Sequence, residues 1–212
     1  MRPTEPGFLV KICGVTSAED AAVAIEAGAN AIGFNFYPKS PRYVTPETAC
    51  SIAESVPGGY RKVGVFVNAG IDELSRIAER AGLDTVQLHG DRSATPPRYR
   101  VWRSIAGESG VPDHDERVEA YVLDTDTADF GGSGRTFAWS CAAGFPYPAI
   151  VAGGLDASNV SDAIAQTAPW GVDACSRLES RPGKKDPQRV REFVRAALDA
   201  SRRFLLDRVS TV

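Results

Sequence analysis

The sequence has few of the residues on which several classes of site depend. Only two of its 212 residues are histidines, whereas a catalytic zinc site usually takes two or three. The cysteines are four in number, lie far apart and include no C-x-x-C pair: Cys13, Cys50, Cys141 and Cys175. This pattern predicts neither a zinc site nor a disulfide scaffold, and it fits a reducing, cytoplasmic location. A magnesium site made only of carboxylates stays open.

Long apolar runs and an excess of basic charge are also missing. No run approaches the roughly 18 apolar residues of a membrane span, and residues 1–7 lack the apolar core of a secretion signal. The net charge of −3 predicts no large basic face for nucleic acid. With 43% hydrophobic and 24% charged residues, the composition is typical of a folded domain rather than a disordered chain. We therefore expect one domain over residues 1–212, with a small-molecule substrate and with neither a membrane nor a nucleic-acid partner.

The chain does contain a regular alternation of short apolar strands and helix-like segments. The expected strands are 8–12, 31–36, 63–67, 85–88, 101–104, 119–124, 147–152 and 171–175. The expected helices are 17–27, 46–55, 71–81, a poor one at 94–99, 157–166 and 187–206, with Ser17 and Thr45 as N-caps. Eight such units predict a single (β/α)₈ TIM barrel with short loops and a degenerate helix after the fifth strand. An open doubly wound sheet is the alternative, but it leaves part of the pattern unexplained.

In a barrel of this kind, chemistry lies at the carboxyl ends of the strands. Lys11 and Cys13 are two residues apart on the first strand and point to one side, so a lysine could lower the pKa of a thiol that acts as a base or nucleophile. Asp124 ends the sixth strand and could provide an acid across the barrel. The plainer alternatives are a small buried cysteine and an aspartate that caps the next loop.

Two further groups of residues suit an anionic substrate. Gly153 and Gly154 end the seventh strand and Ser176 follows the eighth, where TIM barrels often bind phosphate. The glycine-rich segment 131–134, which includes Gly132, follows the sixth strand. Arg42 lies in a loop with two prolines and could bind a carboxylate through two hydrogen bonds; a solvated surface arginine is the alternative reading.

Seven segments in order resemble the phosphoribosylanthranilate isomerase family. They are K-I-C-G-V-T (11–16), G-F-N-F-Y-P-K-S-P-R-Y-V (33–44), G-V-F-V-N (64–68), V-Q-L-H-G-D (86–91), L-D-T-D-T-A-D-F-G-G-S-G-R-T-F-A-W (123–139), A-G-G-L-D-A-S-N-V (152–160) and V-D-A-C-S-R-L-E-S-R-P-G-K-K-D (172–186). The resemblance implies a single TIM barrel without metal or organic cofactor. It also implies an enzyme of tryptophan biosynthesis that rearranges N-(5′-phosphoribosyl)anthranilate to 1-(2-carboxyphenylamino)-1-deoxyribulose 5-phosphate.

By this resemblance, Cys13 is the general base and Asp124 the general acid of an Amadori rearrangement. Arg42 would hold the anthranilate carboxylate, and Gly154, Ser176 and nearby amides the phosphate. The full set of candidate substrate-binding residues is Lys11, Arg42, Gln87, Gly132, Gly153, Gly154, Asp173, Ser176 and Arg177. To donate a proton, Asp124 needs a pKa raised well above about 3.9; apolar barrel walls and a phosphate dianion act in that direction.

The sequence departs from the family pattern beside the phosphate loop. Arg177 stands where a small residue is common, and it either adds charge to the phosphate or turns outward as a surface residue. Cys175 stands where serine is frequent, and we interpret it as a packing residue. His89, at the end of the fourth strand, is a less favoured alternative base.

Other functions remain open at this point. A related sugar-phosphate isomerase, of the histidine pathway or bifunctional, has a carboxylate in place of Cys13 and needs a second phosphate site. No strong second site follows the third or fourth strand. A catalytically silent barrel that serves as a partner protein is the other alternative. The oligomeric state, monomer or homodimer, cannot be read from the sequence.

Overall fold

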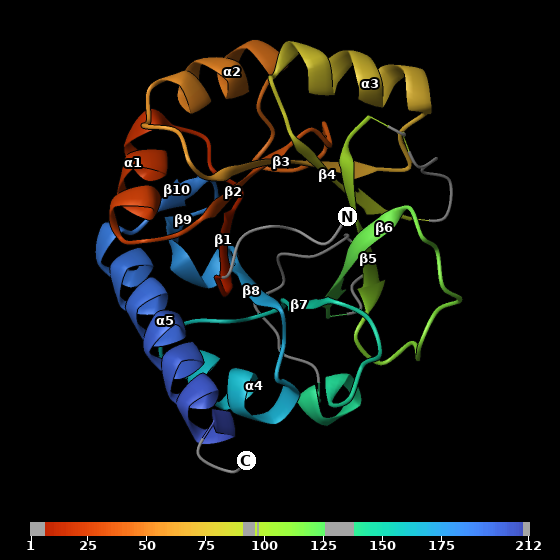
Figure 1. The fold of residues 1–212 in the computed structure, drawn as a ribbon. Helices are drawn as coiled ribbons and strands as arrows, with labels where there is room; N and C mark the ends of the chain where they lie inside the picture. The colour runs from red at the N-terminus through yellow and green to blue at the C-terminus, as the bar shows by residue number, and fades with distance from the viewer. Residues whose placement is uncertain (1–6, 91–95, 97, 126–137, 210–212) are drawn as a thin grey trace.

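Eight parallel strands form a closed barrel in the computed structural model, which describes residues 7–90, 96, 98–125 and 138–209 (Figure 1). Each strand pairs with the next, and β8 pairs with β1. The strands are β1 (Leu9–Cys13), β2 (Ala31–Asn35), β3 (Arg61–Val67), β4 (Thr85–His89), β5 (Arg100–Ala106), β6 (Val118–Asp124), β7 (Ala149–Val151) and β8 (Gly171–Ala174). The predicted TIM barrel is confirmed, and the open sheet is excluded.

Five α-helices occur among the described residues, and they cover the outside of the barrel (Figure 1). They are α1 (Ala18–Glu26), α2 (Pro46–Glu54), α3 (Ile71–Arg80), α4 (Val160–Thr167) and α5 (Pro187–Val209). Ser17 and Thr45 cap α1 and α2 as predicted, since their side chains accept hydrogen bonds from the amides of Asp20 and Thr48. These short-range signals therefore place both helix starts correctly.

The described residues between β4 and β7 form no α-helix. In the segment predicted as a helix at 94–99, Pro96, Arg98 and Tyr99 are not helical, and positions 94, 95 and 97 lie outside the described residues. Residues 107–117, between β5 and β6, contain no helix, as the predicted degenerate unit requires. A short 3₁₀-helix, η1 (Trp139–Ala142), precedes β7. The degenerate unit after β5 is therefore confirmed, whereas the poor helix expected at 94–99 is wrong at its described positions.

Apolar side chains fill the barrel below the strand ends. This inner cluster comprises Leu9, Ala31, Val63, Trp102, Ala120, Val122, Ile150 and Ala152. Trp102 is fully buried, and its indole N–H donates to Glu119 Oε2 at 2.9 Å. A filled interior of this kind is the usual TIM-barrel core, and it gives the polar strand ends a rigid base.

After β8 the chain forms features that the sequence pattern does not predict. A 3₁₀-helix, η2 (Ser176–Leu178), leads into a hairpin of β9 (Glu179–Arg181) and β10 (Lys184–Lys185). This hairpin brings Glu179 and Lys185 back to the barrel mouth. Within the described residues, no helix has the length and apolar character needed to cross a membrane.

Candidate active site

A buried ion pair lies at the carboxyl end of the barrel. Lys11 on β1 and Asp173 on β8 are register partners, and Lys11 Nζ donates to Asp173 Oδ2 at 2.6 Å with the lysine fully buried. Burial opposes charge on Lys11, but Asp173 and Cys13 more than offset it and raise the lysine pKa. Burial raises the pKa of Asp173 to about 7, against the opposing effect of Lys11. The predicted position of Lys11 beside Cys13 is therefore observed, with Asp173 as its partner.

Cys13 ends β1, and the thiol of Cys175 lies beside the next residue, Gly14, where a Cβ would approach its Sγ to 3.0 Å. A hydrogen bond between the two thiols, together with burial, raises the pKa of Cys13 although Lys11 acts in the opposite direction. The same hydrogen bond and the nearby cations Lys185 and Arg42 lower the pKa of Cys175 to about 6. Lys11 lowers the pKa of Cys13 as expected, but the expectation of a pKa near neutral is wrong, because the effects of Cys175 and burial are larger. The two thiols titrate as a coupled pair, in which the thiolate is favoured on Cys175.

Asp124 ends β6 at the same mouth of the barrel. Burial and the nearby Asp173 carboxylate raise its pKa to about 6, against opposing effects of the Thr125 amide and Lys11. The Thr125 amide donates to Asp124 Oδ1 at 2.7 Å. Gly153 has φ of +79°, and a Cβ there would come within 2.9 Å of Asp124 Oδ1. A glycine is therefore required at this point, because a side chain would collide with the Thr125 hydroxyl and crowd the Asp124 carboxylate.

Arg42 binds a carboxylate of the protein itself. Its Nε and Nη2 donate to Glu179 Oε1 and Oε2, each at 2.8 Å. Lys185, which is fully buried, donates to the same carboxylate at 3.1 Å. Arg42 and Lys185 overcome the effect of burial and lower the pKa of Glu179. The cluster carries a net positive charge, and the Nη1–Nη2 edge of the guanidinium is left for a second anion.

A second group of polar side chains comes from β4 and β5. Gln87 Nε2 donates to Ser104 Oγ at 2.9 Å and lies 3.1 Å from His89 Nε2. Burial, and secondarily Lys11, lower the pKa of His89 to about 4, so its imidazole is neutral at pH 7 and a weak base. Among the described residues, Gln87 Oε1 and Asp173 Oδ1 are buried acceptors without a hydrogen-bond donor. Buried acceptors of this kind are costly unless a ligand supplies a donor.

The glycines after β7 and the residues after β8 lie at the carboxyl ends of two adjacent strands. Gly153 and Gly154 both have positive φ, +79° and +61°, which turns the chain sharply at the end of β7. The Gly154 carbonyl accepts from Asn159 Nδ2 at 2.9 Å, and Asn159 precedes α4. Ser176 begins η2 directly after Cys175. Gly132, the other glycine proposed for this region, lies outside the described residues.

Arg177 turns toward the outside of this segment. Its Nη1 donates to Asp156 Oδ2 at 2.6 Å, and the side chain is 41% exposed. Of the two alternatives from the sequence, the geometry favours a surface arginine.

Replacing Arg177 with alanine should therefore change KM for a phosphorylated substrate by less than about threefold, because exposed ion pairs contribute less than about 1 kcal/mol. Steady-state kinetics on the two proteins measures this. A rise in KM of about tenfold or more, with turnover unchanged, would place Arg177 on the phosphate instead.

Three residues of this site are given no functional role in the sequence analysis. Glu179 and Lys185 stand in a segment that resembles the family, but only the fold shows that they are buried against Arg42. Cys175 is interpreted from sequence as packing, whereas its thiol lies beside Gly14 at the end of β1 and 3.8 Å from Lys185 Nζ. The sequence does contain a signal for this position. Cys175 is two residues after Asp173, just as Cys13 is two residues after Lys11, so on extended strands both cysteines are expected to point to the same side as Asp173 and Lys11.

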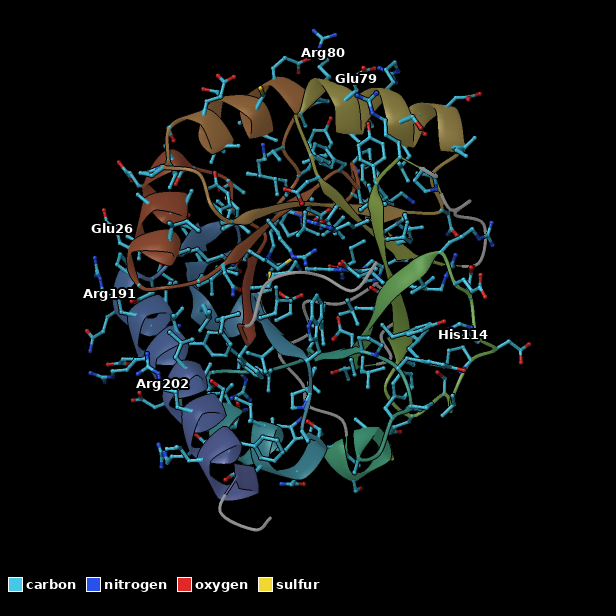
Figure 2. The ribbon with its side chains drawn as sticks, viewed as in Figure 1. Glu26, Glu79, Arg80, His114, Arg191 and Arg202 are labelled. Carbon is cyan, nitrogen blue, oxygen red and sulfur yellow. The ribbon has the colours of Figure 1, made fainter. Side chains whose placement is uncertain are left out.

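Most charged side chains elsewhere lie on the outside of the molecule. In Figure 2 the labelled Glu26, Arg80, Arg191 and Arg202 project from the helices away from the barrel, and His114 lies at the periphery between β5 and β6. Among the described residues, no group of three or more His, Cys, Asp or Glu side chains is arranged to hold a metal ion. The buried charged groups are thus concentrated at the carboxyl end of the barrel.

Comparison with known proteins assigns this arrangement to a family. The sequence profile described as N-(5′phosphoribosyl)anthranilate (PRA) isomerase matches residues 10–196. The N-(5′-phosphoribosyl)anthranilate isomerase of Solibacter usitatus is 49% identical over 196 residues, covering 90% of this chain and 97% of the relative. The phosphoribosyl anthranilate isomerase of Thermus thermophilus superposes with a TM-score of 0.78 at 32% identity, over 89% of this chain and 97% of that one.

A further solved structure carries a bound molecule. It is a phosphoribosyl anthranilate isomerase in complex with reduced 1-(o-carboxyphenylamino)-1-deoxyribulose 5-phosphate, with a TM-score of 0.74 and 35% identity over 90% of this chain and 98% of that one. Together with the barrel and the polar site at its mouth, these matches show that the chain belongs to the phosphoribosylanthranilate isomerase family, enzymes of tryptophan biosynthesis.

Proposed function

We propose that this isomerase rearranges N-(5′-phosphoribosyl)anthranilate to 1-(2-carboxyphenylamino)-1-deoxyribulose 5-phosphate with Asp124 as general acid and Cys13 as general base. The observation that carries the proposal is the placement of a carboxyl group of raised pKa and a thiol on separate strand ends at one barrel mouth. An aldose-to-ketose rearrangement needs an acid and a base at different atoms of the substrate.

The acid step opens the ribose ring. Asp124, whose pKa is about 6, gives its proton to the ring oxygen as the C1′–O bond breaks, and the anilino nitrogen supplies the electrons of the Schiff base. A carboxyl group with this pKa holds a proton in a useful fraction of molecules near neutral pH, unlike an ordinary aspartate.

The base step removes the proton from C2′. Cys13 must be a thiolate to accept it, and in the resting pair the thiolate is favoured on Cys175. Transfer of the shared proton from Cys13 to Cys175 produces the active base without a change in net charge. Loss of the C2′ proton then gives an enolamine, which tautomerises to the ketone product.

The two ends of the substrate suit the two remaining parts of the site. We assign the anthranilate carboxylate to the Nη1–Nη2 edge of Arg42, and the phosphate to the backbone around Gly153, Gly154 and Ser176. Gln87 Oε1 and Asp173 Oδ1, the unpaired buried acceptors, suit the hydroxyl groups of the sugar. We further propose a cytoplasmic enzyme that needs no metal and acts as a monomer or homodimer.

The test is the loss of phosphoribosylanthranilate fluorescence with the purified protein in the presence of a metal chelator. Turnover that resists the chelator supports both the substrate and the metal-independent mechanism. The two-phosphate aldose substrate of the histidine pathway is assayed in parallel, because a related or bifunctional isomerase would act on it. Turnover of neither substrate would favour a silent barrel.

Replacing Arg42 with alanine should raise KM about 10- to 100-fold, since hydrogen bonds to charged groups contribute about 1.5–3 kcal/mol. The Glu179→Gln variant is the matched control, because it keeps Arg42 but weakens its support and should raise KM less. Steady-state kinetics with unfolding curves separates binding from stability. If Arg42→Ala left both KM and turnover unchanged, the carboxylate assignment would be wrong.

A further inference from the structure

Cys13 is the last residue of β1, and Cys175 directly follows the last residue of the adjacent strand β8. β1 and β8 pair in parallel, with Lys11 opposite Asp173 and Ile12 opposite Ala174, and the next step along each strand reaches the two cysteines. The side chains of Lys11 and Asp173, two residues earlier, meet at 2.6 Å. Because side chains alternate along a strand, the two thiols point to that same side.

The spacing of neighbouring strands suits a disulfide between the residues at their ends. Neighbouring strands lie about 4.7–4.9 Å apart, and a disulfide joins residues whose Cα atoms are about 4.4–6.8 Å apart. Gly14 directly follows Cys13, and a Cβ on it would lie 3.0 Å from Cys175 Sγ, so the second thiol lies beside the end of β1. Glycines leave them room, since a Cβ on Gly33 would approach Cys13 Sγ to 2.9 Å and one on Gly14 would approach Cys175 Sγ to 3.0 Å.

We propose that Cys13 and Cys175 form a modification site, a dithiol that peroxides convert to an intramolecular disulfide. Both side chains are partly accessible, so a small oxidant can reach them at the barrel mouth. Cys175 Sγ lies 3.8 Å from Lys185 Nζ, and nearby cations favour the thiolate, which is the reactive form. Cys175 is thus the attacking thiol and Cys13 the resolving one.

The chemistry balances with one peroxide for each disulfide. The Cys175 thiolate attacks a peroxide oxygen, the O–O bond breaks, and the sulfur becomes a sulfenic acid while hydroxide takes up a proton and leaves as water. Cys13, giving up its proton, then attacks that sulfur and the sulfenic oxygen leaves as a second water. Two thiols lose two electrons, and hydrogen peroxide is reduced to two waters. A dithiol reductant reverses the bond by thiol–disulfide exchange.

The consequence for activity rests on the proposed role of Cys13. A sulfur held in a disulfide cannot accept the C2′ proton, so oxidation should stop turnover and reduction should restore it. The bond protects Cys13 as well, because a disulfide is reducible whereas sulfinic and sulfonic acids are largely irreversible. A serine, which is frequent at position 175 in the family pattern, cannot form a disulfide with Cys13.

The experiment uses the full chain with Cys50→Ser and Cys141→Ser, which leaves only the two thiols of the proposed pair. The protein is treated with hydrogen peroxide, blocked with an alkylating reagent under denaturing conditions, and analysed by intact mass and peptide mapping. We expect a loss of about 2 Da, no alkylation and one cross-linked peptide pair. Activity should fall together with cross-linking and return with dithiothreitol.

The matched variant adds Cys175→Ser, and circular dichroism checks that it folds. Without the second thiol, we expect adducts of about 16 or 32 Da on Cys13, with no cross-link and no recovery of activity from the doubly oxidised form. The proposal is overturned if the two-thiol protein gains oxygen without losing both thiols, or if its oxidation matches that of the Cys175→Ser protein. Cross-linking is measured by mass, separately from turnover. A protein that cross-links but is inactive even when reduced would therefore contradict the proposed function, and it would still support the proposed modification site.

Discussion

Replacing Cys13 with alanine should reduce turnover by about 10²–10⁴-fold, the usual contribution of a positioned general base. The side chain is small and ends β1 beside Gly33, so its removal leaves the barrel strands and their pairing in place. KM should change much less than turnover, because Cys13 is assigned to neither end of the substrate. The measurement is the initial rate of fluorescence loss, with circular dichroism to check the fold.

A serine at position 13 separates proton transfer from shape. The hydroxyl is close to the thiol in size and can hydrogen-bond with Cys175, but it ionises far less readily. Turnover by Cys13→Ser should therefore be nearly as low as that of the alanine variant. If Cys13→Ser or Cys13→Ala kept wild-type turnover, Cys13 would not be the base, and Cys175 would be the next residue to test.

The barrel itself could be predicted because its signals are local. Strand and helix periods, and caps such as Ser17 and Thr45, depend on residues a few positions apart. The wrong helix at 94–99 had a local signal against it as well. Pro96 and Pro97 are consecutive, and a proline disfavours helical geometry in the residue before it.

The site could be predicted only in part because its contacts are long-range. The side chains that end strands, Cys13 and Asp124 among them, follow from the strand pattern and the TIM-barrel rule. The ion pair between Arg42 and Glu179 joins residues 137 positions apart, and no period or spacing predicts it. Its discovery changes the expected role of Arg42, because one edge of the guanidinium is already occupied.

The electrostatics also depend on contacts that a sequence does not give. The raised pKa of Asp124 was expected from apolar walls and a substrate phosphate, and burial is indeed its first cause. The second contribution comes from Asp173 rather than from a bound phosphate. Two carboxyl groups close together resist simultaneous ionisation, so Asp173 keeps Asp124 partly protonated before substrate binds.

A raised pKa also has a consequence for stability. Folded Asp124 has a pKa of about 6, above its ordinary 3.8, so between these values the folded state binds more protons than the unfolded state. Its contribution is therefore full below about pH 4 and is lost as pH rises through 6. At pH 7–8 the buried charge costs up to about 3 kcal/mol, from the size of the pKa shift. The buried Asp124 carboxyl group thus lowers the free energy of unfolding at neutral pH.

Replacing Asp124 with asparagine should consequently lower activity and raise stability together. Asparagine is nearly isosteric with aspartate and can still accept the hydrogen bond from the Thr125 amide, but it has no carboxyl proton to donate. Turnover should fall about 10²–10⁴-fold, while the free energy of unfolding at pH 7–8 should rise by roughly 1–3 kcal/mol and change little at pH 4. Kinetics and denaturant unfolding at the two pH values measure both effects.

The pH profile of the wild-type enzyme provides the independent check. If Asp124 is the acid, kcat/KM should decline above about pH 6, since that limb reports the free enzyme. The corresponding limb of kcat should lie at higher pH, because a bound phosphate dianion disfavours ionisation of the carboxyl group. Asp124→Asn should lose this limb. Wild-type turnover by Asp124→Asn would exclude Asp124 as the acid, whereas low turnover without the stability gain would show that the carboxyl group is not held protonated by its surroundings.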